Sequence, residues 1–166
     1  MTQDAVDRIV EQWAQERPEL ETAAMAVFGR VFRLSRLVGD EMETVYARHG
    51  LGRPDFDVLA TLRRSGPPYE LSPGALASSM MLSSGGTTAR LDRLEKAGLV
   101  HRGADPHDRR GVLVRLTPHG RRTVDEAVAA GLARQQELLR HLPPEQQARL
   151  NALLRAVLEP LEVSPP

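Results

Sequence analysis

The stretch from Leu71 to Thr117 constrains the fold of this chain more than any other, because it combines two helix signals with two strand signals. Ser72 followed by Pro73 is a strong helix start, since a capping hydroxyl precedes a proline in the first turn. Both predicted helices carry apolar residues at helical spacing. These residues are Leu71, Leu76, Met80 and Leu82 in the first helix, and Leu91, Leu94 and Ala97 in the second.

The second of these helices is predicted to open at Ser83 or Ser84 and to stop at Gly98, since glycine readily adopts the left-handed conformation of a helix end. Only a few residues separate the two helices, as in a helix-turn-helix. Two short alternating runs follow, at Leu99–Arg102 and Val112–Leu116. The loop between them, GADPHDRRG, is basic and rich in turn residues, which predicts an exposed hairpin tip. The predicted fold class is therefore mainly α with a small β-hairpin wing, a winged helix-turn-helix.

The charge of the chain is unevenly distributed. The whole chain has 22 Lys and Arg and 22 Asp and Glu, a net charge of zero. Residues 83–122 hold nine Lys and Arg against four acidic residues, so this window carries +5 and the remainder −5. A basic surface on an acidic body is typical of a protein that binds double-stranded DNA.

Two segments of the winged motif carry a resemblance to a known family. The segments SSGGTTARLDRLEKAGLV and DPHDRRGVLVRLTPHGR, residues 83–100 and 105–121, closely resemble the multiple-antibiotic-resistance regulator (MarR) family of transcription factors. The match covers the recognition helix, the wing and the start of the next helix. The resemblance implies a dimeric DNA-binding regulator.

Helical periodicity outside the winged motif predicts long terminal helices. The predicted helices span residues 4–16, 19–49, 54–65, 118–141 and 144–162. We expect a single domain with N-terminal extension and dimerisation helices at 1–49, the winged helix-turn-helix at 54–117 and C-terminal dimerisation helices at 118–162. So much helix around a small DNA-binding motif favours a homodimer whose terminal helices pack together. The alternative is a monomer with a helical cap.

The recognition helix supplies most of the candidate DNA-binding residues. Small hydroxyl residues at its start can bond phosphates or bases, and arginine can bind guanine in a bidentate manner. By resemblance, Arg93 contacts phosphate. For the two serines, helix capping alone is the alternative. The candidates are Ser83, Ser84, Thr87, Thr88, Arg90 and Arg93.

The wing supplies the other candidates. In the resembling family an aspartate orients an arginine that enters the minor groove, which implies Asp108 and Arg110 here, with Arg109 on the DNA backbone. Arginine in a narrow minor groove gains from its enhanced negative potential. The alternative is a solvated turn with incidental charges.

Four residues indicate an effector site. Asp57 and Arg64 are seven apart, two helical turns, so both should project from one helix face roughly 10 Å apart. Arg90 lies on the recognition helix, and Trp13 on an added first helix. This set resembles the urate-responsive branch of the family, which has the same spacings and a tryptophan on an added helix. The resemblance implies that urate binds there.

The chemistry of these residues suits a flat anion. An indole can pack against a purine and a guanidinium can pair with its charge. An anion near Arg64 and Arg90 would compete with the Asp57 interactions that place the recognition helix. A polycarboxylate or a phenolic acid could use the same arginines. Taken singly, Arg64 could instead face a helix C-terminus, and Trp13 could be a core anchor.

Other function classes lack their signatures. The absence of cysteine excludes disulfides, thiolate metal sites and the cysteine-based peroxide switch of one branch of the family. The chain contains no G-x-S-x-G, P-loop or G-x-G-x-x-G motif, so we expect no enzyme and no cofactor. His101, His107 and His119 cluster near the wing without metal-ligand spacing, which favours solvated histidines over a metal site.

The sequence pattern is not that of a signal peptide or of a membrane span. The chain contains no apolar run of 18 residues, and its start, MTQDAVDRIVEQW, is acidic and amphipathic, so we expect no membrane span and a cytoplasmic location. The sequence thus predicts a homodimeric repressor that binds a pseudo-palindromic operator and is released by a small anion, most simply urate. A constitutive or architectural DNA-binding protein without an effector is the alternative.

Overall fold

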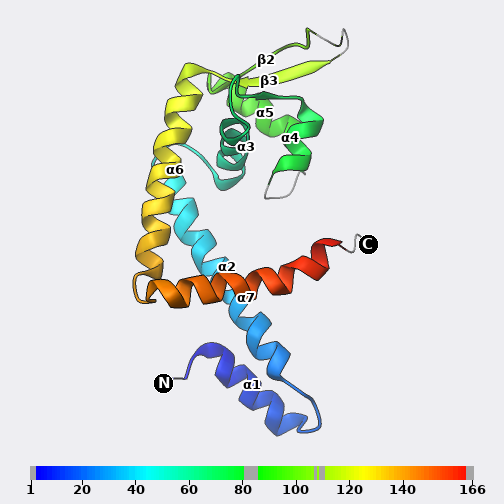
Figure 1. Ribbon diagram of the computed structural model, residues 1–166, viewed down its shortest axis with the longest axis vertical. Helices are drawn as coiled ribbons and strands as arrows, with labels where there is room; N and C mark the ends of the chain where they lie inside the picture. Colours follow the sequence, from blue (N-terminus) through cyan, green and yellow to red (C-terminus); the bar gives the residue numbers. More distant parts are fainter. Residues whose placement is uncertain (1–2, 81–85, 107, 109–110, 164–166) are drawn as a thin grey trace. The chain divides into compact units, whose positions relative to one another are not determined.

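The computed structural model describes residues 3–80, 86–106, 108 and 111–163, shown in Figure 1. The chain forms two compact units, Met1–Arg53 and Pro54–Pro166. Within the described residues, no helix is both long and apolar enough to cross a membrane.

The N-terminal unit consists of α1 (Ala5–Glu16) and α2 (Ala23–Ala47). Asp4 caps α1 by accepting hydrogen bonds from Val6 N at 2.7 Å and Asp7 N at 3.0 Å, and the Asp7 carboxylate accepts one from Asp4 N at 2.9 Å. This reciprocal arrangement is a capping box, which satisfies amide donors that the first turn leaves without partners. Arg30 of α2 donates to both carboxylates, so the cap also ties α1 to α2.

The start of α2 differs from the prediction. The sequence predicted a helix from residue 19, directly after Pro18, but Leu20 N donates to Arg17 O at 3.1 Å, so Pro18 and Glu19 lie in a turn. The helix begins at Ala23 instead, after Thr22. The predicted start at residue 19 was therefore wrong by one helical turn.

The C-terminal unit contains the winged helix-turn-helix. Its helices are α3 (Arg53–Arg64), α4 (Pro73–Ser79), α5 (Thr87–Lys96), α6 (Pro118–Leu139) and α7 (Pro144–Val163). Its strands are β1 (Glu70–Leu71), β2 (Val100–Ala104) and β3 (Val112–Leu116). The strands pair in the order β1-β3-β2, all antiparallel. Figure 1 shows α6 leaving the sheet at the end of β3.

The core of this unit lies where α3, α4, α5 and the sheet meet. It is built from the apolar positions that the periodicity indicated: Val58, Leu59, Leu62, Leu76, Leu91, Leu94, Val100, Val114, Leu116 and Val124, all buried. Ser72 caps α4 by accepting from Ala75 N at 3.2 Å, which confirms the predicted start of that helix. The mainly helical winged helix-turn-helix is thereby confirmed.

Two details of the motif differ from the prediction. Leu71 belongs to β1, which pairs with β3 opposite Val114, so it does not extend the apolar stripe of α4. The recognition helix α5 begins at Thr87, not at Ser83 or Ser84, because its N-cap Gly86 is left-handed with φ of 74°.

Candidate nucleic-acid interface

The recognition helix α5 presents one face to the core and another to solvent. Leu91 and Leu94, one helical turn apart, are both buried and fix the rotation of the helix. The exposed side chains of α5 therefore form an outer face, which consists of Thr88, Ala89, Asp92, Arg93 and Lys96.

The predicted DNA-binding positions on α5 fall on two parts of the helix surface. Thr88 and Arg93 are exposed, whereas Thr87 and Arg90 are half-buried at the border of the core. Ser83 and Ser84 lie outside the described residues. The outer face thus combines a hydroxyl with guanidinium and ammonium donors, which are the groups that bind phosphate oxygens and base edges.

Arg93 has a protein partner that the sequence did not indicate. Its Nη2 atom lies 2.8 Å from Asp55 Oδ1, in the first turn of α3. A guanidinium carries five N–H donors, so this contact leaves donors for a phosphate oxygen while it fixes the direction of the side chain. The expected phosphate contact of Arg93 is compatible with this geometry and stays a prediction.

Arg102 joins the wing to the recognition helix. Its backbone N donates to Glu95 Oε1 at 2.8 Å, its Nε lies 3.1 Å from Glu95 Oε2, and its Nη2 pairs with Asp92. The hydrogen bond that Arg102 donates to Asp92 raises the pKa of Arg102 above its ordinary value, so the guanidinium stays charged. The two acidic side chains of α5 are thus neutralised by β2 and add little repulsion toward DNA.

The wing is the hairpin of β2 and β3, and two backbone hydrogen bonds lie just beyond the ends of these strands. Asp105 N donates to Gly111 O at 3.0 Å, and Gly111 N donates to Asp108 O at 2.8 Å. A Cβ at Gly111 would lie 2.8 Å from Asp105 Cβ, which explains a glycine at this position. Asp108 therefore helps to close the turn through its backbone. His107, Arg109 and Arg110 lie outside the described residues, so the predicted minor-groove contact stays a prediction.

Of the predicted effector residues, α3 carries Asp57 and Arg64. Asp57 is buried, at 5% exposed, whereas Arg64 is exposed. The two side chains thus differ in burial, although the sequence suggested that both project from one polar face. The Arg64 guanidinium donates to the carbonyl oxygen of Ser79, the last residue of α4. Arg64 therefore does face a helix C-terminus, the alternative that the sequence left open.

The other two predicted effector residues lie on different elements. Arg90 is on α5, half-buried, in the same unit as Asp57 and Arg64. Trp13 lies on α1 in the N-terminal unit and is 43% exposed, so it is no core anchor of this chain. Its place in a site with the arginines stays a prediction.

Of the three histidines near the wing, His101 and His119 lie within the described residues. His101 is exposed, with Nδ1 3.9 Å from Glu95 Oε1. Among the residues that the structure describes, no three His, Cys, Asp or Glu side chains are placed to hold a metal ion.

Sequence reasoning missed Asp55 and Arg102 as parts of the interface. Each acts through a partner on another element, 38 residues away for Asp55 and 7 to 10 residues away for Arg102. The one available signal was the i, i+3 spacing of Asp92 and Glu95, which places both acids on one helix face next to the following strand.

The known proteins that this chain resembles are transcriptional regulators. The pattern that defines the MarR family matches residues 49–111. The HTH-type transcriptional regulator PecS of Dickeya dadantii is 37% identical over 152 residues, 92% of this chain and 92% of that protein. The multiple antibiotic resistance protein MarR of Salmonella typhimurium is 35% identical over 104 residues, 62% of this chain and 70% of that protein.

A solved structure shares the fold as well. Sco3205, a MarR family transcriptional regulator from Streptomyces coelicolor, was crystallised in complex with DNA. It is 25% identical, with a TM-score of 0.75 over 88% of this chain and 94% of that one.

Proposed function

The chain belongs to the MarR family of DNA-binding transcriptional regulators, a non-enzymatic family, and from this premise we propose that it is a homodimeric repressor released by a small anion. The dimer binds a pseudo-palindromic operator, and urate is the proposed effector. The outer face of α5 next to a basic wing is the observation that carries the DNA-binding part of this proposal.

The homodimer is supported by the surface of the terminal helices. No described residue of α7 is buried, although the helix carries a leucine-rich stripe. Leaving such a stripe in water is unfavourable, by about 25 cal/mol for each Å² of apolar surface. Helices of a second chain would cover it, and the symmetry of that pair would match a two-fold operator. The exposed apolar side chains of α7 are Leu150, Leu153, Leu154, Val157, Leu158 and Leu161.

The release step is supported by the position of Arg64. Its guanidinium donates to the carbonyl of Ser79 and so ties α3 to the end of α4, the helix that precedes α5 in the chain. An anion that recruits this guanidinium would free the end of α4 and change the placement of the recognition helix. The ligand shifts the equilibrium only as far as it prefers the released arrangement.

The DNA-binding part is tested by selecting bound duplexes from a random pool and measuring affinity for the selected site. We expect a pseudo-palindrome whose half-sites are about one helical turn, ~10 base pairs, apart. Arg110→Ala should weaken binding by about 1–3 kcal/mol, and Asp108→Ala should do so less, by freeing the arginine. Unchanged affinity for Arg110→Ala in gel-shift titrations would remove the wing from the mechanism.

The effector part is tested through Trp13, the only tryptophan of the chain. Urate should quench its fluorescence, and operator-bound protein should bind urate more weakly by the same factor that urate weakens operator binding. Arg64→Ala should lose the urate response and also weaken DNA binding without ligand, because it removes the hydrogen bond to Ser79 O. Arg140→Ala, which removes an exposed charge just after the end of α6, should retain both. A wild-type response from Arg64→Ala contradicts the site.

Two further variants separate the roles within the site. Arg90→Ala should damage DNA binding and the urate response together, because Arg90 lies on the recognition helix. Asp57→Ala should loosen that helix and weaken DNA binding without ligand. Release by citrate or a phenolic acid, with no effect of urate, would keep the site and change the effector. No response to any anion would leave a constitutive DNA-binding protein.

A further inference from the structure

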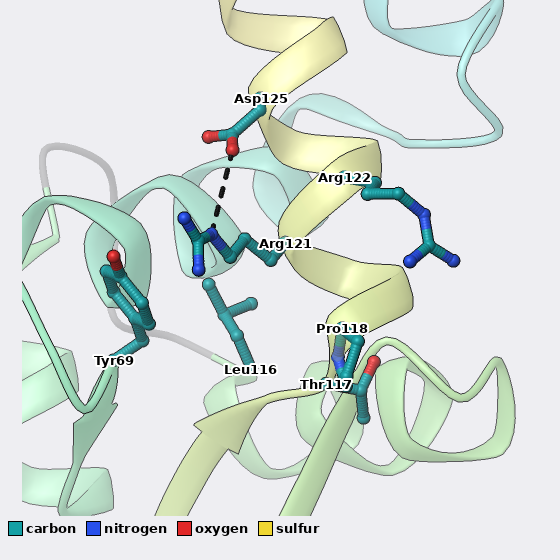
Figure 2. Close-up of a pocket in the computed structure, with 7 residues that line it drawn as sticks. All are labelled: Tyr69, Leu116, Thr117, Pro118, Arg121, Arg122 and Asp125. Atoms are coloured by element: carbon teal, nitrogen blue, oxygen red, sulfur yellow. Dashed lines mark ion pairs between the residues drawn. The ribbon is translucent and has the colours of Figure 1, made fainter.

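A cavity of about 510 Å³ lies where β3 passes into α6, shown in Figure 2. One wall is apolar and is formed by Tyr69, Leu116 and Pro118, and the other carries Arg121, Arg122 and Asp125. In Figure 2, Arg121 points toward Tyr69, whereas Arg122 extends along another side of α6. The cavity contains none of the residues assigned above to DNA or to the effector, so it is a separate site.

Tyr69 is held in an unusual backbone conformation. Its φ is 63°, in the left-handed region, which costs a residue with a Cβ roughly 1–2 kcal/mol. Two backbone hydrogen bonds keep it there, from Tyr69 N to Gly66 O at 2.7 Å and from Leu116 N to Tyr69 O at 3.1 Å. Such outliers concentrate at functional sites, and this one directs an aromatic ring to the cavity wall.

The ring of Tyr69 fixes two guanidinium groups. The Cζ atoms of Arg63 and Arg121 each lie 4.9 Å from the ring centroid, within the range of cation–π attraction. Arg63 and Arg121 belong to α3 and α6, so the ring stands where the ends of two helices meet. Stacking holds a guanidinium by its face and leaves its N–H donors at the edge available.

Asp125 accepts a hydrogen bond from Arg63 but not from Arg121. Arg63 Nε donates to Asp125 Oδ1 at 2.7 Å, and this hydrogen bond raises the pKa of Arg63. Arg121 Nε is 4.0 Å from Asp125 Oδ2, too far for a hydrogen bond. Within the described residues, the side chain of Arg121 donates no hydrogen bond. Arg121 is thus a stacked guanidinium whose fork of donors faces an open cavity.

Arg121 and Arg122 stand close to the N-terminal end of α6. The N-terminal end of a helix carries partial positive charge and favours acidic residues, yet the first turn of α6 contains none and two arginines follow at once. Here the helix end and Arg121 both attract an anion.

We propose that this cavity binds a phosphate group, with Arg121 as its bidentate partner and Tyr69 as the platform that orients Arg121. Guanidinium matches phosphate geometry with two parallel N–H···O bonds, and the surplus of arginine over carboxylate suits a dianion. The volume lies within the range of small-molecule sites and exceeds what a bare phosphate fills, so free phosphate and a small phosphomonoester are both possible sources. The proposal does not depend on the urate site.

The test is a titration of the full-length protein with inorganic phosphate and with phenyl phosphate, at ionic strength held constant with chloride. The chain has two tyrosines, so the ring signals of Tyr69 can be followed by NMR with Tyr46, in the other unit, as internal reference. We expect Tyr69 alone to shift. Arg121→Ala should weaken binding at least tenfold, and Arg140→Ala, at the C-cap of the same helix and outside the cavity, should bind as wild type.

Further variants and ligands test whether the cavity binds phosphate through Arg121. Arg121→Lys keeps the charge without the fork and should also bind more weakly, which a purely electrostatic attraction would not produce. Tighter binding of phenyl phosphate than of phosphate identifies an ester as the ligand, and equal binding identifies the free ion. Equal binding by Arg121→Ala and wild type overturns the proposal. So does a tenfold loss of operator affinity in Arg121→Ala without phosphate, because Arg121 would then contact DNA.

Discussion

The two halves of α6 differ sharply in how they are packed. At the N-terminal half, Gly120, Val124 and Ala127 are buried, and a Cβ at Gly120 would lie 1.9 Å from the carbonyl oxygen of Leu99. At the C-terminal half, Leu132, Leu138 and Leu139 are exposed. One continuous helix therefore begins inside the DNA-binding motif and ends as an uncovered apolar surface.

This difference shows how the helix can transmit a change. The backbone contact at Gly120 and the Thr117 hydroxyl, which donates to Gly98 O at 2.7 Å, fasten the start of α6 to the end of α5. Because packed contacts of this kind do not deform gradually, a rotation of the C-terminal half would move the recognition helix with it. If α6 and α7 pair between two chains, dimer geometry sets the spacing of the two recognition helices.

The largest expected effect comes from removing the uncovered surface. Truncation after Pro143 deletes α7 and its six exposed leucine and valine side chains. We expect loss of the dimer and of operator binding together, or aggregation, because the remaining apolar surface of α6 would lose its cover. Light scattering measures the oligomeric state, and gel shift measures operator binding. A monodisperse truncated dimer would show that the interface lies elsewhere.

The next effect concerns the packed half. Gly120→Ala places a methyl group against the Leu99 carbonyl, so backbone must move, and we expect a loss of about 3 kcal/mol, the upper end for overpacked cores. Gly74→Ala in α4 is the control, since a Cβ there meets nothing within 4 Å and should be neutral or stabilising by roughly 0.4–1 kcal/mol. Urea melts compare them. Equal stability of the two variants would mean that α6 is not fastened at Gly120.

Local signals predicted the elements of the fold, and tertiary contacts explain where they failed. Serine before proline placed the start of α4 correctly, because capping is decided within one turn, and the predicted start of α6 at residue 118, after Thr117, was also correct. The two-residue strand β1 was missed, since Glu70–Leu71 is too short to show alternation and exists only by pairing with β3. The start of α2 was misplaced because the turn after Arg17 resembles a proline-opened helix in sequence.

In the candidate site, too, the sequence predicted local features and missed tertiary contacts. Helical periodicity predicted that Leu91 and Leu94 face the core, which leaves Thr88 and Arg93 outside. The partners of the arginines could not be predicted, because Arg64 reaches Ser79 and Arg121 reaches Tyr69 only after several elements have packed. Sequence spacing places a side chain on a helix face, but its contacts depend on the neighbouring elements.

A smaller effect tests the cap that joins α6 to α5. The Thr117 hydroxyl accepts from Gly120 N at 2.9 Å and donates to Gly98 O, so Thr117→Val loses both hydrogen bonds. We expect a loss of about 0.5–2 kcal/mol, the usual cost of removing an N-cap, and weaker operator binding. Thr123→Val removes only a bond to His119 O within the helix and should change neither quantity. Thermal melts measure the stability and gel shifts the operator affinity of both variants. Equal effects of Thr117→Val and Thr123→Val would contradict a connection between α6 and α5 through Thr117.

The smallest effect lies in the exposed half of α6, at the pair of Arg134 and Glu137, whose Nη1 and Oε2 atoms are 2.5 Å apart. The hydrogen bond from Arg134 lowers the pKa of Glu137. A lowered carboxyl pKa gives stability that is present above the ordinary glutamate value of about 4.3 and is lost as pH falls through the lowered pKa. Thermal melts should therefore give a slightly higher melting temperature for wild type than for Glu137→Gln at pH 7. This difference should vanish as the pH falls below the lowered pKa of Glu137. In an isolated chain the pair is exposed and screened, so the difference should be close to the limit of detection.

If a second chain covers this half of the helix, the difference should grow with protein concentration, and the double variant Arg134→Gln with Glu137→Gln should abolish its pH dependence. A pH-dependent difference that persists in the double variant would assign the effect to other groups and leave this half of α6 without electrostatic evidence of a partner.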